Sequence, residues 1–290
     1  MIAAVALKQE ARRQDRTPRL LLRIEDLDPD RSKKRWADQL QRDLELFDFE
    51  WDAEVLKQSE RTEAYLQAFS RLAEIGLTYP CYCTRADLHV AHAPHAGEDF
   101  IYPGTCRSLS APDLEARHSY RLRVPDAAQS QSVIAFDDLF QGNCSSNLAL
   151  DSGDFVIKRA DGVFAYQLAV AVDDAWQGVD QVVRGYDLLS STPRQLYIQS
   201  LLGLHHPDYG HVPLLVDEEG RRLAKRNRST SLEHLLEERK LPPEAVLGKL
   251  AFQAGIIDDD VAMSLSELSD QADLTRLEAK RTLCVTGLEP

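Results

Sequence analysis

Carboxylates follow a short apolar run near the start of the chain, in the segment RIEDLDPDR at residues 23–31. The run RLLLRI at 19–24 is typical of a short buried strand. Ligands of open parallel sheets bind beyond the carboxyl ends of the strands, so Glu25 is a candidate for binding a cationic group. The alternative is that Asp28 or Asp30 caps the following helix and Glu25 is merely solvated.

A second set of polar residues interrupts the apolar stretch FAYQLAVAVDDAWQGVDQVVRGYDLL at 164–189. Tyr166 and Gln167, the pair Asp173 and Asp174, and Arg184 would lie on one helix and the strand after it, where they could converge on a pocket. The alternative is that the two aspartates only cap the helix or form local ion pairs with Arg184 as their partner. Spacing alone leaves both hypotheses open.

The densest basic stretch is GRRLAKRNR, from Gly220 to Arg228, which contains Lys225 and follows the strand-like HVPLLV at 211–216. A lysine on a mobile loop can place positive charge on transferring phosphates without a glycine-rich cradle. The sequence contains neither a P-loop nor a GxGxxG motif. A solvated basic loop is the alternative, since the formal net charge of −13 argues against nucleic-acid binding over the whole surface.

Three of the five cysteines, Cys81, Cys83 and Cys106, cluster in sequence, whereas Cys144 and Cys284 stand apart. The odd number and the absence of a visible export signal argue against a disulfide framework. A reducing cytoplasm and a metal site explain the cluster better, although three reduced cysteines without a metal remain the alternative.

Apolar periodicity predicts an α/β fold in which helices alternate with strands. The expected helices cover residues 2–13, the stretch carrying Trp36, Leu40, Leu44 and Phe47, the stretch carrying Tyr65, Phe69 and Leu72, residues 164–178 and residues 193–204. The expected strands cover residues 19–24, 119–124, 132–136, 155–159, 179–185 and 211–216. No segment approaches 18 consecutive apolar residues, so no membrane span is expected.

In this order and spacing, RIEDLDPDR, the segment at 164–189 and RRLAK resemble the motifs of the glutamyl-tRNA synthetase group of class I synthetases. The resemblance covers roughly residues 2–230 and implies a Rossmann-like catalytic domain over 1–230, with a zinc-binding insertion at 78–110 and a helical region at 231–290. It also implies that glutamate reacts with ATP, accompanied by Mg²⁺, to give glutamyl-adenylate before transfer to a tRNA.

Within that group the likeness is greatest to the short paralogues that transfer glutamate to the queuosine base in the anticodon of tRNA(Asp). Only about 65 residues follow Lys225, too few for the large anticodon-binding domain of tRNA-charging relatives. The alternatives are a fragment of a glutamyl-tRNA synthetase, or a non-catalytic zinc-containing RNA-binding protein. A cytoplasmic monomer is expected.

The resemblance assigns roles to individual residues. It implies that Glu25 contacts the amino group of bound glutamate and that Tyr166 and Arg184 complete the amino-acid pocket. It identifies Lys225 as the second lysine of the KMSKS loop, the catalytic residue that binds the ATP phosphates. Arg222 and Ala224 depart from the usual Lys and Ser of that loop.

The cysteine cluster matches the Cys-x-Cys…Tyr-x3-Cys pattern of the paralogue's zinc site. The resemblance therefore implies one structural zinc ion per chain, held by Cys81, Cys83, Tyr102 and Cys106. Tyrosine is an uncommon zinc ligand, and a histidine of the same segment, His89, His92 or His95, could take the fourth position instead.

The segment IAAVALKQEAR at residues 2–12 resembles the helix that follows the HIGH-type ATP motif of the family. That motif and the strand before it would precede Met1, so we expect the sheet to lack a central strand. Either the start was assigned too late or the product is inactive, and the intact remaining motifs favour the first explanation.

Overall fold

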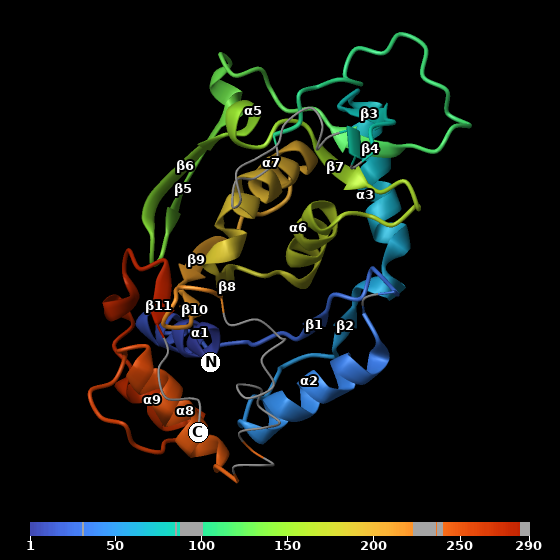
Figure 1. Ribbon diagram of the computed structural model, residues 1–290. Coiled ribbons are helices and arrows are strands. Elements are labelled where there is room, and N and C mark those ends of the chain that lie inside the picture. The colour runs from blue at the N-terminus through green and yellow to red at the C-terminus, as the bar shows by residue number, and fades with distance from the viewer. Residues whose placement is uncertain (31, 85, 88–100, 223–235, 237–239, 285–290) are drawn as a thin grey trace.

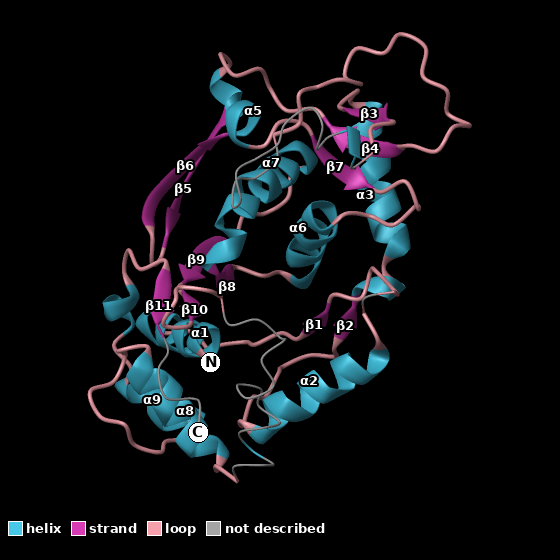
Figure 2. Ribbon diagram, viewed as in Figure 1, coloured by secondary structure: helices cyan, strands magenta, loops and turns pink. Residues whose placement is uncertain are grey.

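A computed structural model describes residues 1–290 with the exception of 31, 85, 88–100, 223–235, 237–239 and 285–290. Helices and strands alternate along much of this part of the chain, so the prediction of an α/β fold is confirmed (Figure 2). No helix of the described residues is long and apolar enough to cross a membrane.

The longer helices occur at both ends of the chain and between its sheets. They are α1 (Ile2–Arg13), α2 (Lys34–Leu46), α3 (Thr62–Glu74), α6 (Tyr166–Gln177), α7 (Thr192–Leu202), α8 (Pro243–Gln253) and α9 (Leu265–Gln271), with a short α5 (Leu148–Asp151). Gly178 takes the left-handed conformation that ends α6, and Pro193 stands in the first turn of α7.

In the described part of the chain the strands form four small sheets. They are β1 (Arg23–Ile24), β2 (Leu56–Lys57), β3 (Thr78–Cys81), β4 (Ser119–Leu122), β5 (Val133–Asp138), β6 (Gly142–Asn147), β7 (Phe155–Lys158), β8 (Gln181–Gly185), β9 (Asp208–Val212), β10 (Leu214–Val216) and β11 (Thr282–Cys284). The largest sheet has the order β6-β5-β9-β8, with β8 and β5 each parallel to β9. β3, β4 and β7 form an antiparallel sheet, whereas β1–β2 and β10–β11 are parallel pairs.

Two helices connect the sheets that carry the polar motifs. In the middle of the molecule α6 packs against α7, α3 and β7, and α7 also packs against β5 (Figure 1). Their apolar side chains share a core with Tyr65 and Leu72 of α3 and Leu122 of β4. No backbone ladder joins β1 to β8 among the described residues. The position of Glu25, which follows β1, relative to the larger sheet therefore depends on side-chain contacts.

Residues 240–284 pack against the start of the chain. Val5 and Ala6 of α1 lie in one apolar cluster with Val246 of α8 and Leu268 of α9. Gln9 of α1 also donates hydrogen bonds to backbone carbonyls at the end of α9. Besides helices, this region supplies β11, which pairs with β10. A domain boundary at residue 230 remains a prediction.

Three sequence expectations differ from the structure. Of the strand expected at 19–24, only Arg23–Ile24 pairs with another strand. The strand expected at 211–216 is interrupted at Pro213, which has no N–H to donate to a ladder. The helix expected around Trp36 exists as α2, but its apolar side chains are not packed in the core: Trp36 is 59% and Leu40 is 48% exposed.

The expected cap of that helix is also wrong. The residue before α2 is Lys33, and no side chain caps the helix. Asp28 instead accepts the backbone N–H of Asp30 and forms an ion pair with Arg159 at 2.7 Å. The carboxylates after β1 therefore stabilise their own turn and a distant loop, while Glu25 takes part in neither contact.

Candidate active site

Three sequence-predicted side chains share one electrostatic environment at the end of β1. Glu25 follows β1, Tyr166 is the first residue of α6, and Arg184 lies in β8. The Glu25 side chain is 43% exposed, but nearby protein atoms partly desolvate it and raise its pKa, and the positive charges of Arg23 and Arg184 offset only part of that rise. Burial and the negative charge of Glu25 raise the pKa of Tyr166. Electrostatic coupling between these groups means that the fold brings the three elements together.

Asp174 of α6 ties β1 to the site. Arg23 Nη1 donates to Asp174 Oδ1 at 2.7 Å and to Gln177 Oε1 at 3.1 Å, while Arg23 Nη2 lies 3.5 Å from Glu25. The Asp174 side chain is only 3% exposed. Burial raises the pKa of Asp174 more than the Arg23 charge lowers it. Arg23, which the sequence hypotheses did not include, therefore holds two carboxylates at the end of β1.

Asp173, the neighbouring carboxylate, has a different set of partners. It accepts hydrogen bonds from Gln58 Nε2 at 2.9 Å, Arg61 Nε at 2.6 Å and Tyr65 Oη at 2.7 Å, and its side chain is fully buried. Burial raises the pKa of Tyr65, and so does the hydrogen bond to Asp173. Asp173 thus joins α6 to the start of α3 and serves the fold.

Arg184 does not pair with either aspartate, contrary to the alternative hypothesis. Its Nε donates to His211 Nε2 at 3.0 Å, and its Nη2 donates to Thr192 Oγ1 at 2.7 Å and to the Leu188 carbonyl at 3.3 Å. The fully buried His211 in turn lies 2.5 Å through Nδ1 from Asp138 Oδ2. Sequence reasoning missed His211 and Asp138, because they lie 73 residues apart.

Several buried polar atoms near the site have no hydrogen-bond partner in the described part of the chain. They include Asp174 Oδ2, the side-chain amides of Gln195 and Gln199, and Tyr209 Oη. Gln195 and Gln199 lie one turn apart on α7 and are fully buried. Buried polar groups are normally satisfied by protein, water or ligand. Gln195 and Gln199 lie close enough to Tyr166 and Tyr209 to affect the pKa of each phenol, whereas Asp174 Oδ2 is a buried acceptor without a partner among the described residues. Gln167 Nε2 donates to Ser191 at 3.0 Å, and its Oε1 has no partner in the described part of the chain.

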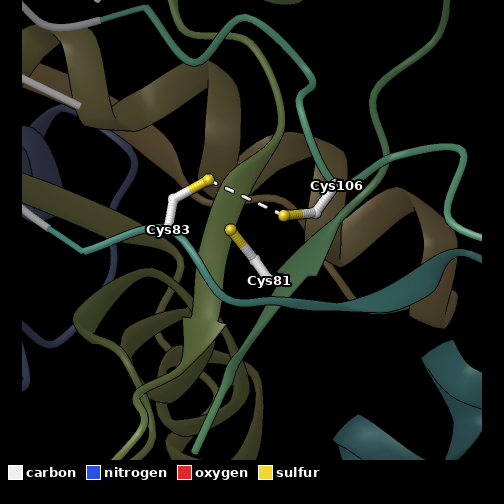
Figure 3. Close-up of side chains that lie close together, drawn as sticks. All are labelled: Cys81, Cys83 and Cys106. Atoms are coloured by element: carbon white, nitrogen blue, oxygen red, sulfur yellow. Dashed lines mark hydrogen bonds between the residues drawn. The ribbon is translucent and has the colours of Figure 1, made fainter. Parts of the chain in front are cut away.

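The three cysteines of the 78–110 segment converge at the end of β3 (Figure 3). Their sulfur atoms all lie within 4.8 Å of one another, and Cys83 Sγ is 3.6 Å from Cys106 Sγ. Tyr102 Oη is 3.4 Å from Cys81 Sγ and 3.8 Å from Cys83 Sγ. Among the described residues, Tyr102 is therefore the side chain that approaches the cluster as a fourth donor.

This donor set fits a tetrahedral zinc ion. Zn–S bonds of about 2.3 Å place sulfurs about 3.8 Å apart, and a Zn–O bond of about 2.0 Å places the oxygen about 3.5 Å from each sulfur. The observed separations of 3.6, 3.4 and 3.8 Å lie near those values. The histidines considered as alternatives, at positions 89, 92 and 95, lie outside the described residues.

Arg121 of β4 supplies positive charge to this cluster. Its Nε donates to Cys81 Sγ at 3.2 Å, and its guanidinium stacks 3.6 Å from the centre of the Tyr102 ring. Burial would raise the pKa of Cys81, but its hydrogen bonds with Tyr102 and Arg121 outweigh burial and lower that pKa. Burial raises the pKa of Cys83 to about 11.

Lys225 lies outside the described residues, so its predicted role is not tested by geometry. The start of the basic stretch is described, and acidic neighbours neutralise it. Arg221 pairs with Asp217 at 2.9 Å, and Arg222 pairs with Asp187 at 2.8 Å. Arg222, where the resemblance expects a lysine, thus contacts the turn directly after β8.

Residues 6–286 match the family described as tRNA synthetases class I (E and Q), catalytic domain. The chain belongs to this family of ligases. Its content of mixed helix and strand agrees with a class I synthetase catalytic domain.

Curated relatives within this family resemble the chain more closely than the family model alone indicates. A protein of Thiobacillus denitrificans named Glutamyl-Q tRNA(Asp) synthetase is 47% identical over 232 residues, which cover 80% of this chain and 74% of the relative. One of Geobacter sulfurreducens with the same name is 49% identical over 234 residues, 80% of this chain and 72% of the relative.

Among solved structures, a glutamate tRNA ligase from Elizabethkingia meningosepticum, in complex with its amino acid, superposes with a TM-score of 0.76 at 22% identity. It covers 97% of this chain, which spans 63% of the length of that structure. At this identity, the superposition shows a shared fold.

Replacing Asp173 with Asn tests its structural role. The change removes the buried charge that faces Arg61, and we expect it to lower the free energy of unfolding by about 3 kcal/mol. Chemical denaturation measures this. The matched change Asp180→Asn removes the charge of a side chain that is 76% exposed and lies 3.7 Å from Arg16, and should cost less than about 1 kcal/mol. Equal costs for both changes would refute the proposed role of Asp173 in joining α6 to the start of α3.

Proposed function

We propose that this protein activates glutamate with ATP and transfers it to the queuosine base in the anticodon of tRNA(Asp). The observation that carries the proposal is the convergence of Glu25, Tyr166 and Arg184 at the end of β1 in a member of this synthetase family. A carboxylate complements an ammonium group, and a guanidinium complements a carboxylate. The three side chains thus offer opposite charges to an amino acid that carries both.

In the first step, a carboxylate oxygen of glutamate attacks the α-phosphorus of ATP. A P–O bond to the α-phosphorus forms as the bond to pyrophosphate breaks, giving glutamyl-adenylate. In the second step, a hydroxyl of queuosine attacks the acyl carbon and AMP leaves. Lys225 stabilises the phosphate charges and Mg²⁺ accompanies ATP, while Glu25, Tyr166 and Arg184 bind and orient the glutamate.

The choice of tRNA is supported by relatives rather than by contacts. The curated relatives that carry the name Glutamyl-Q tRNA(Asp) synthetase share 44–49% identity with this chain over about four fifths of its length. Charging of tRNA(Glu) is the competing function, and the acceptor assay separates the two.

We also propose that Cys81, Cys83, Tyr102 and Cys106 hold one structural zinc ion. Bound zinc would link the end of β3 to the segment around Tyr102 and Cys106. A closed site of four protein ligands leaves no position for a substrate, so its contribution would be to stability. Arg121 would offset part of the negative charge of three thiolates around a divalent ion.

The acceptor preference tests the proposed function. Pyrophosphate exchange should depend on glutamate without any tRNA. Radiolabelled glutamate should then be transferred to tRNA(Asp) that carries queuosine, but not to the same tRNA with guanine in its place. Activity confined to tRNA(Glu) would identify a charging enzyme instead. Absence of both exchange and transfer would refute the proposed reaction.

Metal analysis of the purified chain tests the zinc site. We expect about one equivalent of zinc, and its loss in Cys106→Ser together with a lower unfolding temperature, because the ligand set is then incomplete. Cys144→Ser is the matched control, since Cys144 lies on β6 away from the cluster, and it should retain the metal. A content below about half an equivalent in the unaltered chain would refute the site.

A further inference from the structure

Hydrogen bonds fix one edge of the Arg184 guanidinium group, the edge formed by Nε and Nη2. Its Nε and Nη2 donate to His211, Thr192 and the Leu188 carbonyl. Its Nη1 has no hydrogen-bond partner in the part of the chain that the structure describes. Because a guanidinium is planar and rigid, fixing one edge fixes the direction of the remaining N–H groups. The free Nη1 is therefore aimed by the residues behind it.

The hydrogen bonds determine the tautomer of His211. Arg184 Nε can only donate, so His211 Nε2 must carry a lone pair and accept at 3.0 Å. The proton of the neutral ring then sits on Nδ1, where it is donated to Asp138 Oδ2 at 2.5 Å. An imidazole with the opposite tautomer would present a second donor to Arg184 and repel it.

Asp138 is itself held in one orientation. Its Oδ1 accepts three backbone N–H groups, from Phe140, Gln141 and His211, each at 3.0 Å. This arrangement leaves Oδ2 for the imidazole. The side chains of Asp138 and His211 are both fully buried, so water does not compete for either hydrogen bond. Backbone of β9 and of the turn after β5 thus fixes the carboxylate that selects the tautomer.

We propose that Asp138 and His211 are positioning residues that orient Arg184 toward a carboxylate of the bound amino acid. The inference rests on the proposed function, because it assumes that Arg184 binds glutamate. Neither Asp138 nor His211 contacts the substrate in this arrangement. They act through Arg184, much as a buried aspartate orients the histidine of a catalytic triad. The preference for an anionic group comes from the positive charge of Arg184 itself, and the pair sets only the direction of its Nη1 donors.

The variant Asp138→Asn tests the inference directly. The amide oxygen replaces Oδ1 at the three backbone N–H groups, so the NH₂ group faces His211 Nδ1 and forces that nitrogen to accept. His211 then carries its proton on Nε2, against the Arg184 donor. We expect the dissociation constant for glutamate, measured by calorimetry, to rise at least about 10-fold, while ATP binding changes less than about 2-fold.

The tautomer provides a readout that a loss of stability alone would not change. In ¹⁵N spectra of histidine-labelled protein, the His211 ring should be protonated on Nδ1 in the unaltered chain and on Nε2 in Asp138→Asn. The matched control Asp137→Asn alters the exposed neighbouring residue, whose side chain contacts Asn143. It should leave both the spectrum and the glutamate affinity unchanged.

A second pair of variants applies if Asp138→Asn does not fold. His211→Gln retains an acceptor oxygen that can reach Arg184, whereas His211→Phe retains only the ring shape. Glutamate affinity should be weakened more by Phe than by Gln. Unchanged affinity in Asp138→Asn, or equal affinities for the Gln and Phe variants, would overturn the inference. If the unaltered chain fails to bind glutamate, the proposed function fails with it, which is a separate and recognisable result.

Discussion

The adjacent carboxylates of Asp173 and Asp174 on α6 are the constraint on which the site depends. Successive helical residues point in directions about 100° apart. One carboxylate therefore reaches Arg61 at the start of α3, and the other reaches Arg23 on β1. β1 has no hydrogen-bonded ladder to the larger sheet among the described residues. These side-chain contacts therefore hold Glu25 near Arg184 of β8.

The site contains two carboxylates on one side and, on the other, a guanidinium without a carboxylate partner among the described residues. Glu25 and Asp174 face Arg23, while Arg184 is directed by a neutral histidine and takes no carboxylate of its own. Burial raises the pKa of both Glu25 and Asp174. An ammonium group bound at Glu25 would restore a favourable partner for that carboxylate, and a substrate carboxylate would do the same for Arg184. The site is therefore complementary to a zwitterion.

Local features of this fold could be predicted from the sequence, and distant pairings could not. The helix at 164–178 followed from apolar spacing, and the three-cysteine cluster followed from two closely spaced cysteines and a third nearby. The partners of the acid pair could not be predicted, since Arg61 and Arg23 lie 112 and 151 residues away from the aspartates they contact. The alternative hypothesis took Arg184 as the ion-pair partner of the two aspartates only because it is close to them in sequence. His211 gave no signal, because one histidine at a strand resembles any buried histidine.

The structure sharpened the two sites to different degrees. It places the oxygen of Tyr102, which the resemblance already implied as a ligand, 3.4 and 3.8 Å from the sulfurs of Cys81 and Cys83, near the separations of a tetrahedral zinc site. At the candidate active site, it replaced a supposed ion pair of Arg184 with a buried chain to Asp138. Lys225 lies outside the described residues, so its role stays a prediction.

The central claim is that Glu25 binds the ammonium group of glutamate in its ionised form. The measurement is the dissociation constant for glutamate as a function of pH, in the unaltered chain and in Glu25→Gln. Because the pKa of Glu25 is raised, affinity should fall as the pH drops through that raised value, above the ordinary range of a glutamate near about 4.3. Glu25→Gln should bind more weakly and lack this dependence. Equal affinities and identical pH profiles for the two proteins would contradict the account.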